Sequence, residues 1–148
     1  MEFKTILVPV DFSEHSARAF DMARGLARRF GSKLHLIHCY PIHSVGLSPF
    51  GLVIPEAFDR DIREAADRHL AQWCDKVAAD KIPVERTITP LFPSEAIVEV
   101  AEEIGADLIV MGTRGLGGIR HVMLGSVAER TVRTAPCPVL TVKASDPD

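Results

Sequence analysis

Short apolar runs alternate with amphipathic segments along the chain, and this alternation limits the possible folds more than any other feature. Between the apolar runs, hydrophobic residues recur at the spacing of helices that bury one face. This alternation predicts a parallel sheet with helices on both faces. The predicted strands are Thr5–Val10, Lys33–Cys39, Val84–Thr89, Asp107–Met111 and Val139–Val142. The predicted helices begin near Ser13, Glu56, Pro93 and Ser126, and Gly31 and Gly105 end the first and the third.

The polarity of the predicted strands indicates their order in the sheet. The first and fourth runs are the most apolar, as expected of central strands, whereas the third contains Glu85, Arg86 and two threonines and suits an edge. The order 3-2-1-4-5 meets both demands and reverses the direction of winding between strands 1 and 4. Ligands of open parallel sheets bind at such a switch point. The chain of 148 residues is therefore predicted to form a single domain, 1–148, with a three-layer, doubly wound, five-stranded α/β fold.

Composition argues against several classes of function. A net charge of -3 and a pI near 6.1 disfavour nucleic acid as a partner. No apolar run approaches the ~20 residues that span a bilayer, so no membrane partner is predicted. Cys39, Cys74 and Cys137 are far apart and form no CxxC pair, which favours the cytoplasm over an oxidising compartment. The six histidines show no metal-binding spacing.

A glycine-containing loop follows the fourth predicted strand. Gly112 and Gly115 open it, and Gly125 precedes Ser126 where the next helix should begin. The segment 108–128 contains no Asp or Glu but includes Arg114, Arg120 and His121. Backbone without Cβ atoms can approach a ligand closely, and a helix N-terminus attracts phosphate. We therefore predict a nucleotide site at this loop, across the switch point from Asp11.

Two common phosphate-binding motifs do not describe this loop. The chain has no Gly-x-x-x-x-Gly-Lys-Ser/Thr run, so the chemistry of phosphate-loop ATPases is not supported. The turn after the first strand, Asp11-Phe-Ser13, lacks the glycines of a dinucleotide fingerprint, and Gly115-Leu-Gly117 has Arg120 in the third glycine position. Binding of NAD or FAD in the usual mode is therefore not expected.

The spacing Gly112-x2-Gly115-x9-Gly125-Ser126 resembles the nucleotide motif of the ATP-binding universal stress proteins. The resemblance extends to Ile6-Leu-Val-Pro-Val-Asp-Phe-Ser13, to Gly125-Ser-Val-Ala-Glu-Arg130 and to Ala135-Pro-Cys-Pro-Val139, and so covers the whole chain. It implies a Rossmann-like fold in the strand order given above, ATP as ligand, with any Mg²⁺ arriving on its phosphates, and a homodimer. The apolar last strand, Val139, Leu140, Thr141 and Val142, is the predicted dimer edge.

Carried over by position, the resemblance implies three groups of contacts. Residues at the ends of the first and second strands would line the adenosine side: Pro9, Val10, Asp11 and the backbone of Cys39. The ribose and phosphates would meet Met111, Gly112, Arg114 and Gly115. The phosphates would be held by Gly125, Ser126 and Val127. Ala128 departs from the pattern, because many members have a hydroxyl residue there.

Structural explanations compete with the binding roles. Ser126-x-x-Glu129 fits a capping box, and Asp11 could cap the first helix instead of contacting a ligand. His38 is expected to be a satisfied core histidine, and the segment 41–55 to be either a plain connecting loop or a loop that closes over the ligand. For the whole protein, an ATP-binding regulatory switch in the stress response is favoured over a slow ATPase or nucleotide hydrolase. A protein-interaction subunit with a structural nucleotide is the third possibility.

Overall fold

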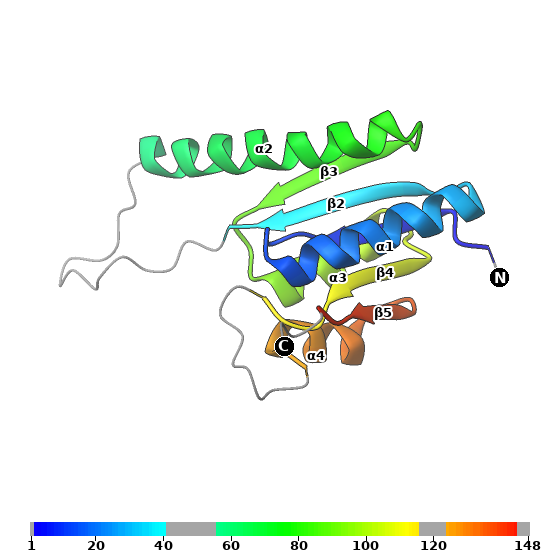
Figure 1. The fold of residues 1–148 in the computed structure, drawn as a ribbon. Coiled ribbons are helices and arrows are strands. Elements are labelled where there is room, and N and C mark those ends of the chain that lie inside the picture. The colour runs from blue at the N-terminus through cyan, green and yellow to red at the C-terminus, as the bar shows by residue number, and fades with distance from the viewer. Residues whose placement is uncertain (1, 41–55, 116–123, 145–148) are drawn as a thin grey trace.

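The computed structural model of the chain describes residues 2–40, 56–115 and 124–144. Its five parallel strands form one sheet in the order β3-β2-β1-β4-β5, which confirms the predicted topology. The strands are β1 (Thr5–Pro9), β2 (Lys33–Cys39), β3 (Val84–Thr89), β4 (Leu108–Gly112) and β5 (Val139–Val142). The helices are α1 (Glu14–Phe30), α2 (Glu56–Ala79), α3 (Pro93–Glu103) and α4 (Ser126–Thr134), and they alternate with the strands (Figure 1).

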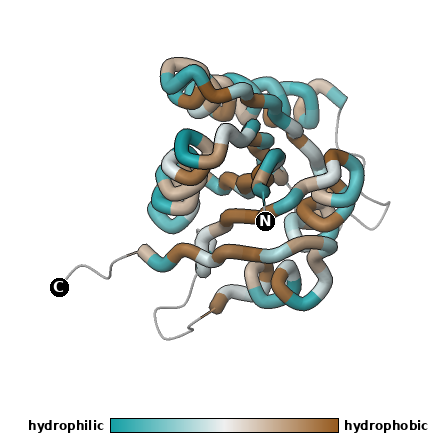
Figure 2. The backbone as a smooth tube through the Cα atoms, turned by 90° about the vertical axis from the view of Figure 1, so that its right-hand side faces the viewer, coloured by the Kyte–Doolittle hydropathy of each residue, from teal (hydrophilic) through white to brown (hydrophobic). Residues whose placement is uncertain are grey.

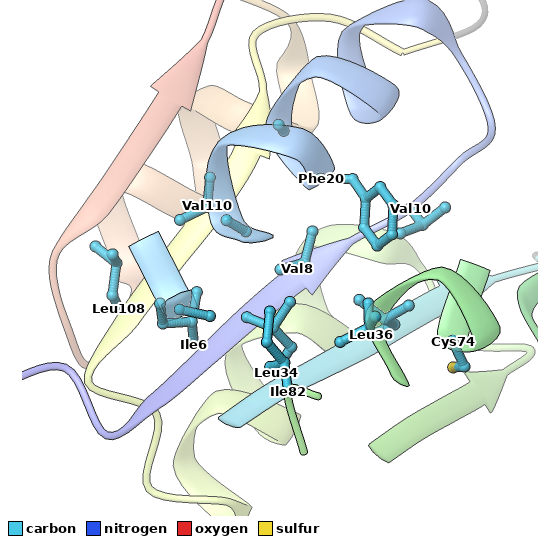
Figure 3. Close-up of a cluster of buried hydrophobic side chains, with 14 of the residues drawn as sticks. Ile6, Val8, Val10, Phe20, Leu34, Leu36, Cys74, Ile82, Leu108 and Val110 are labelled. Atoms are coloured by element: carbon cyan, nitrogen blue, oxygen red, sulfur yellow. The ribbon is translucent and has the colours of Figure 1, made fainter. Parts of the chain in front are cut away.

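The helices cover both faces of the sheet and bury two hydrophobic layers. On one face, α1 and α2 pack on alternate residues of β1, β2 and β4, including Ile6, Val8 and Leu36 (Figure 3). On the other face, α3 and the start of α4 pack on Leu7, Ile37 and the intervening residues of β4. Hydrophobic residues therefore concentrate on the strands, while hydrophilic ones lie mainly on the helices (Figure 2). Strands buried on both faces explain the continuous apolar runs in the sequence.

The two central strands are paired over a shorter length than their neighbours. The β1–β2 register extends from Thr5 to Pro9, whereas the β1–β4 register includes only Ile6 and Leu7 of β1. The chain reverses its winding at this same pair. The carboxyl ends of β1 and β4 are therefore the place where the doubly wound fold has room for a ligand.

Helix α1 begins and ends as its sequence indicates. Ser13 is the N-cap, and its hydroxyl accepts a hydrogen bond from the Ser16 N–H at 3.2 Å. Gly31 ends the helix in the left-handed conformation, with a φ of 70°, where a residue without a Cβ is preferred. Ser13 thus starts the helix shortly after β1, and Gly31 turns the chain toward β2.

The sequence predicts an apolar stripe along α2 at Phe58, Ile62, Ala65, Ala66, Trp73 and Val77, and the structure buries only part of it. Its fully packed residues are Leu70, Cys74 and Val77, at the spacing of one helical face, while Phe58 is 48% exposed. The core contacts of α2 come from its second half. Among the described residues, no helix has the length and apolar character needed to cross a membrane.

Candidate functional site

A cavity of about 520 Å³ lies at the carboxyl ends of β1, β2 and β4 and at the start of α4. This volume is in the range of small-molecule sites. All eleven residues predicted from the sequence line it: Pro9, Val10, Asp11, Cys39, Met111, Gly112, Arg114, Gly115, Gly125, Ser126 and Val127. The structure therefore brings together segments that are more than 100 residues apart in the sequence. That these residues bind a nucleotide stays a prediction.

Asp11 and Phe12 form the bank of the cavity that follows β1. The Asp11 carboxylate lines the cavity, and its Oδ1 accepts a hydrogen bond from the Ser13 N–H at 2.9 Å. Asp11 therefore closes a local turn before the helix, while Ser13 is the residue that caps it. Phe12 has a φ of 63°. This left-handed conformation costs an ordinary residue about 1–2 kcal/mol.

The opposite bank follows β4, and at two of its glycines a Cβ would come closer than 3 Å to another residue. A Cβ on Gly112 would lie 2.8 Å from the backbone carbon of His15, at the start of α1. A Cβ on Gly115 would lie 2.7 Å from Oδ2 of Asp11. Glycine at these positions lets the two banks approach each other closely. The spacing of the motif thus reflects the packing of the loop on α1 and on Asp11.

The N-terminus of α4 opens into the cavity without a side-chain cap. Gly125, not Ser126, is the N-cap, with extended backbone (φ -70°, ψ 161°), and it makes no side-chain cap hydrogen bond. The capping box expected from Ser126 and Glu129 is therefore wrong, because Ser126 is already the first helical residue. A tertiary contact fixes where α4 begins, because the Gly125 N–H donates to the Thr113 carbonyl at 2.6 Å.

An uncapped helix start leaves backbone N–H groups that need acceptors. Ser126, Val127 and Ala128 of the first turn of α4 all line the cavity. Their amides and the helix dipole favour an anion there. Arg114 also lines the cavity, and Asp11 is the one carboxylate among the described lining residues. The α4 side of the cavity is thus suited to phosphate, and the Asp11 side to a hydroxyl donor.

The end of β2 contributes an apolar wall. Cys39 lines the cavity, and burial raises the pKa of its thiol to about 12, so the side chain is neutral at physiological pH. His38 is not among the lining residues: its Nδ1 lies 2.7 Å from the Val10 carbonyl, to which it must donate. This hydrogen bond agrees with the expectation of a satisfied histidine.

Several lining residues were not among the sequence predictions. They are Ser16, Ile37, Pro93, Ile97, Thr113 and Ala128. Thr113 is the most consequential, because its N–H donates to Val142 of β5, its carbonyl accepts from Gly125, and its hydroxyl lies 3.3 Å from Nδ1 of His15. Its position between Gly112 and Arg114 was the available signal. Residues 41–55, Gly117, Gly118, Arg120 and His121 lie outside the described part of the chain.

The fold and the cavity define a class of protein: doubly wound parallel α/β proteins with an anion-receptive site at the switch point. Residues 2–143 match the model of the universal stress protein family. A universal stress protein of Thermus aquaticus, encoded 3′ of the QAH/OAS sulfhydrylase gene, is 36% identical over 143 residues, which cover 95% of this chain and 99% of that protein. The chain belongs to the universal stress protein family.

Solved structures agree with this assignment. The hypothetical protein MJ0577 superposes with a TM-score of 0.87 and 26% identity, covering 99% of this chain and all of that one. A universal stress protein solved in complex with cAMP superposes with a TM-score of 0.72 and 28% identity, covering 98% and 100% of the two chains. The likeness extends over the full sheet and its helices.

Proposed function

We propose that this chain binds an adenine nucleotide, ATP foremost, in the cavity between β1 and β4. The observation that carries the proposal is the open N-terminus of α4, whose first-turn residues line the cavity with no side chain capping them. Backbone amides at a helix start are natural phosphate ligands. The universal stress protein in complex with cAMP supports an adenine nucleotide as the ligand class.

The cavity divides into two chemically different parts that match the parts of ATP. The apolar wall of Val10, Ile37 and Cys39 suits a purine base, and Asp11 suits a group that donates hydrogen bonds, such as a ribose hydroxyl. Gly115 lies between this region and α4. Because it has no side chain, it suits a phosphate chain that passes close to the backbone. Arg114 and the α4 amides would hold the phosphates, and Mg²⁺ would be carried by the phosphates.

We further propose that the nucleotide sets the state of a regulatory switch in the stress response, within a cytoplasmic homodimer. The β5 strand lies at the sheet edge and carries Leu140, which is 37% exposed. An apolar edge strand favours pairing with a second copy. Thr113 links this edge to the cavity, because its N–H donates to Val142 while its carbonyl accepts from Gly125. Nucleotide binding in the cavity and dimer formation at β5 would therefore influence each other through Thr113.

Binding is favoured over efficient hydrolysis. Among the described lining residues, Asp11 is the single carboxylate and there is no histidine to act as a general base. One oxygen of Asp11 already accepts the Ser13 N–H. Slow ATP hydrolysis remains the alternative, with Asp11 orienting water. Turnover that disappears in Asp11→Asn, while ATP binding is retained, would favour that alternative.

Calorimetric titration with ATP and with adenosine tests the proposed function. Arg114→Ala should weaken ATP binding about tenfold or more, the size expected for one lost hydrogen bond to a charged group, and should change adenosine binding little. Arg133→Ala is the matched control, because Arg133 lies on the last turn of α4 with a side chain that is 72% exposed. Absence of any binding heat at millimolar ATP would refute the proposed function.

A further inference from the structure

The strained residue Phe12 is clamped by aromatic rings from two other elements. Its ring stacks on His69 of α2, with centroids 3.7 Å apart and planes 9° from parallel. The His38 ring lies 4.6 Å from it, and the Trp73 ring meets it edge-on at 5.6 Å. Phe12 is half-buried against the core under α1 and α2, so the clamp lies on the face of the sheet opposite to α3.

One peptide bond, between Asp11 and Phe12, joins the cavity to the aromatic clamp formed by His69, His38 and Trp73 around Phe12. Phe12 directly follows Asp11, which lines the cavity. The left-handed conformation of Phe12 turns the chain so that the Asp11 Oδ1 accepts the Ser13 N–H while the Phe12 ring lies on His69. A bulky residue keeps such a conformation only where its surroundings hold it. The stack on His69 is the shortest of the three ring contacts that can do so.

His38 restrains the other side of the same turn. Its Nδ1 donates to the Val10 carbonyl at 2.7 Å, directly before Asp11. The two histidines thus hold the residues on both sides of Asp11, one by a hydrogen bond to backbone and one by stacking. His69 itself is an exposed residue of α2, so burial of apolar surface does not explain why its ring lies in this cluster.

We propose that His69 is a positioning residue of the ligand cavity, acting through the Phe12 ring on the orientation of the Asp11 carboxylate, with His38 as its partner on the backbone. This inference rests on the proposed function for its effect on nucleotide affinity. It also makes α2 part of the site, although α2 contributes no residue to the described cavity lining.

A double-mutant cycle between His69 and Asp11 tests this route. His69→Ala should weaken ATP binding about three- to tenfold, the range that corresponds to one lost stacked pair. Alanine is a better helix former than histidine, so α2 itself is not weakened. In an Asp11→Ala background the same change should have no further effect. An equal loss of affinity in both backgrounds would overturn the proposal.

Two further variants separate positioning from packing. His69→Phe keeps a flat ring against Phe12 and should restore affinity to within about twofold of the parent. Arg68→Ala is the matched control on the neighbouring position of α2, with a side chain that is 71% exposed, and should leave affinity unchanged. Loss of affinity in His69→Phe as large as in His69→Ala would also overturn the proposal.

Amide hydrogen exchange of the ligand-free protein decides the inference independently of nucleotide. The Ser13 N–H, in a buried residue, donates to Asp11, and the Ala17 N–H donates to the Ser13 carbonyl. His69→Ala should lower the protection of the Ser13 amide severalfold and leave Ala17 unchanged. Unchanged protection of Ser13 would refute the inference even if ATP binds. A lowered protection without any ATP binding would uphold it while the proposed function fails.

Discussion

Replacing Gly112 with alanine would insert a methyl group between the end of β4 and the start of α1. The new Cβ would lie 2.8 Å from both the backbone carbon and the Cβ of His15, and 3.0 Å from its carbonyl oxygen. Carbon atoms pack best at about 3.5–4.0 Å, so α1 would have to move away by roughly 0.7 Å or more. Backbone atoms cannot rotate out of the way as the tip of a long side chain can.

The start of α1 is held in place by several contacts that this shift would strain. Ser13 caps the helix, and Nδ1 of His15 accepts the Ala144 N–H at 3.2 Å. Overpacking of this kind costs about 1–3 kcal/mol of unfolding free energy. For a chain of 148 residues, each kcal/mol lowers Tm by about 2–4 °C. ATP affinity should fall as well, because both banks of the cavity would be displaced.

Gly25→Ala is the control within the same helix. Gly25 lies in the interior of α1, and a Cβ there would have no atom within 4 Å. Alanine is favoured over glycine in a helix by about 0.5–1 kcal/mol, so this variant should be stabilised. Urea unfolding of the two variants should show opposite changes in midpoint at equal slope. A Gly112→Ala protein as stable as the parent would refute the packing argument.

Three further predictions follow from individual residues. Ser13→Ala should cost about 1 kcal/mol of stability because Ser13 is an N-cap, whereas Ser126→Ala, at the first helical position, should cost only a few tenths, as measured by denaturant unfolding. Burial lowers the pKa of His35 below its usual 6.5, so the unfolded chain binds a proton at a higher pH than the folded chain does. The contribution of His35 to stability should therefore be complete above pH 6.5 and should fall as the pH drops below that value. His35→Gln should flatten this pH profile in thermal melts at about pH 5–8. Leu140→Glu should convert the proposed dimer to a monomer in sedimentation at tens of micromolar; sedimentation of the parent itself as a monomer would refute the β5 interface.

The fold follows from the sequence because each strand and helix has its own local signal. Continuous apolar runs identified the strands buried on both faces, and the polarity of β3 identified an edge. The strand ends differ by one residue at Val10, Asp107 and Gly112. The Val10 N–H still donates to Ile37 beyond the assigned strand, and the Asp107 carboxylate accepts the N–H of Thr5 at the neighbouring β1. Both residues extend the pairing in ways that a hydropathy pattern does not encode.

The errors come from contacts between distant segments. The apolar spacing of α2 does not reveal which turns of the helix pack on the sheet, so the predicted stripe includes Phe58, which is exposed, and omits Leu70, which is buried. The capping box at Ser126 was a valid local pattern, but a hydrogen bond from Gly125 to Thr113 sets the helix start one residue earlier. The left-handed Phe12 has no sequence signal, because it depends on rings from β2 and α2.

The hydrogen bond between Thr113 and Gly125 fixes these two parts of the cavity relative to each other. The geometry there therefore does not depend on the length of the chain that connects them. Thr113 and Gly125 both line the cavity, and the Gly125 N–H donates to the Thr113 carbonyl at 2.6 Å. The entropic cost of closing a loop grows by only about 0.6 kcal/mol for each doubling of its length. An insertion after Gly115, the last described residue that lines the cavity on this bank, should therefore cost little stability, so a reporter domain can be introduced there.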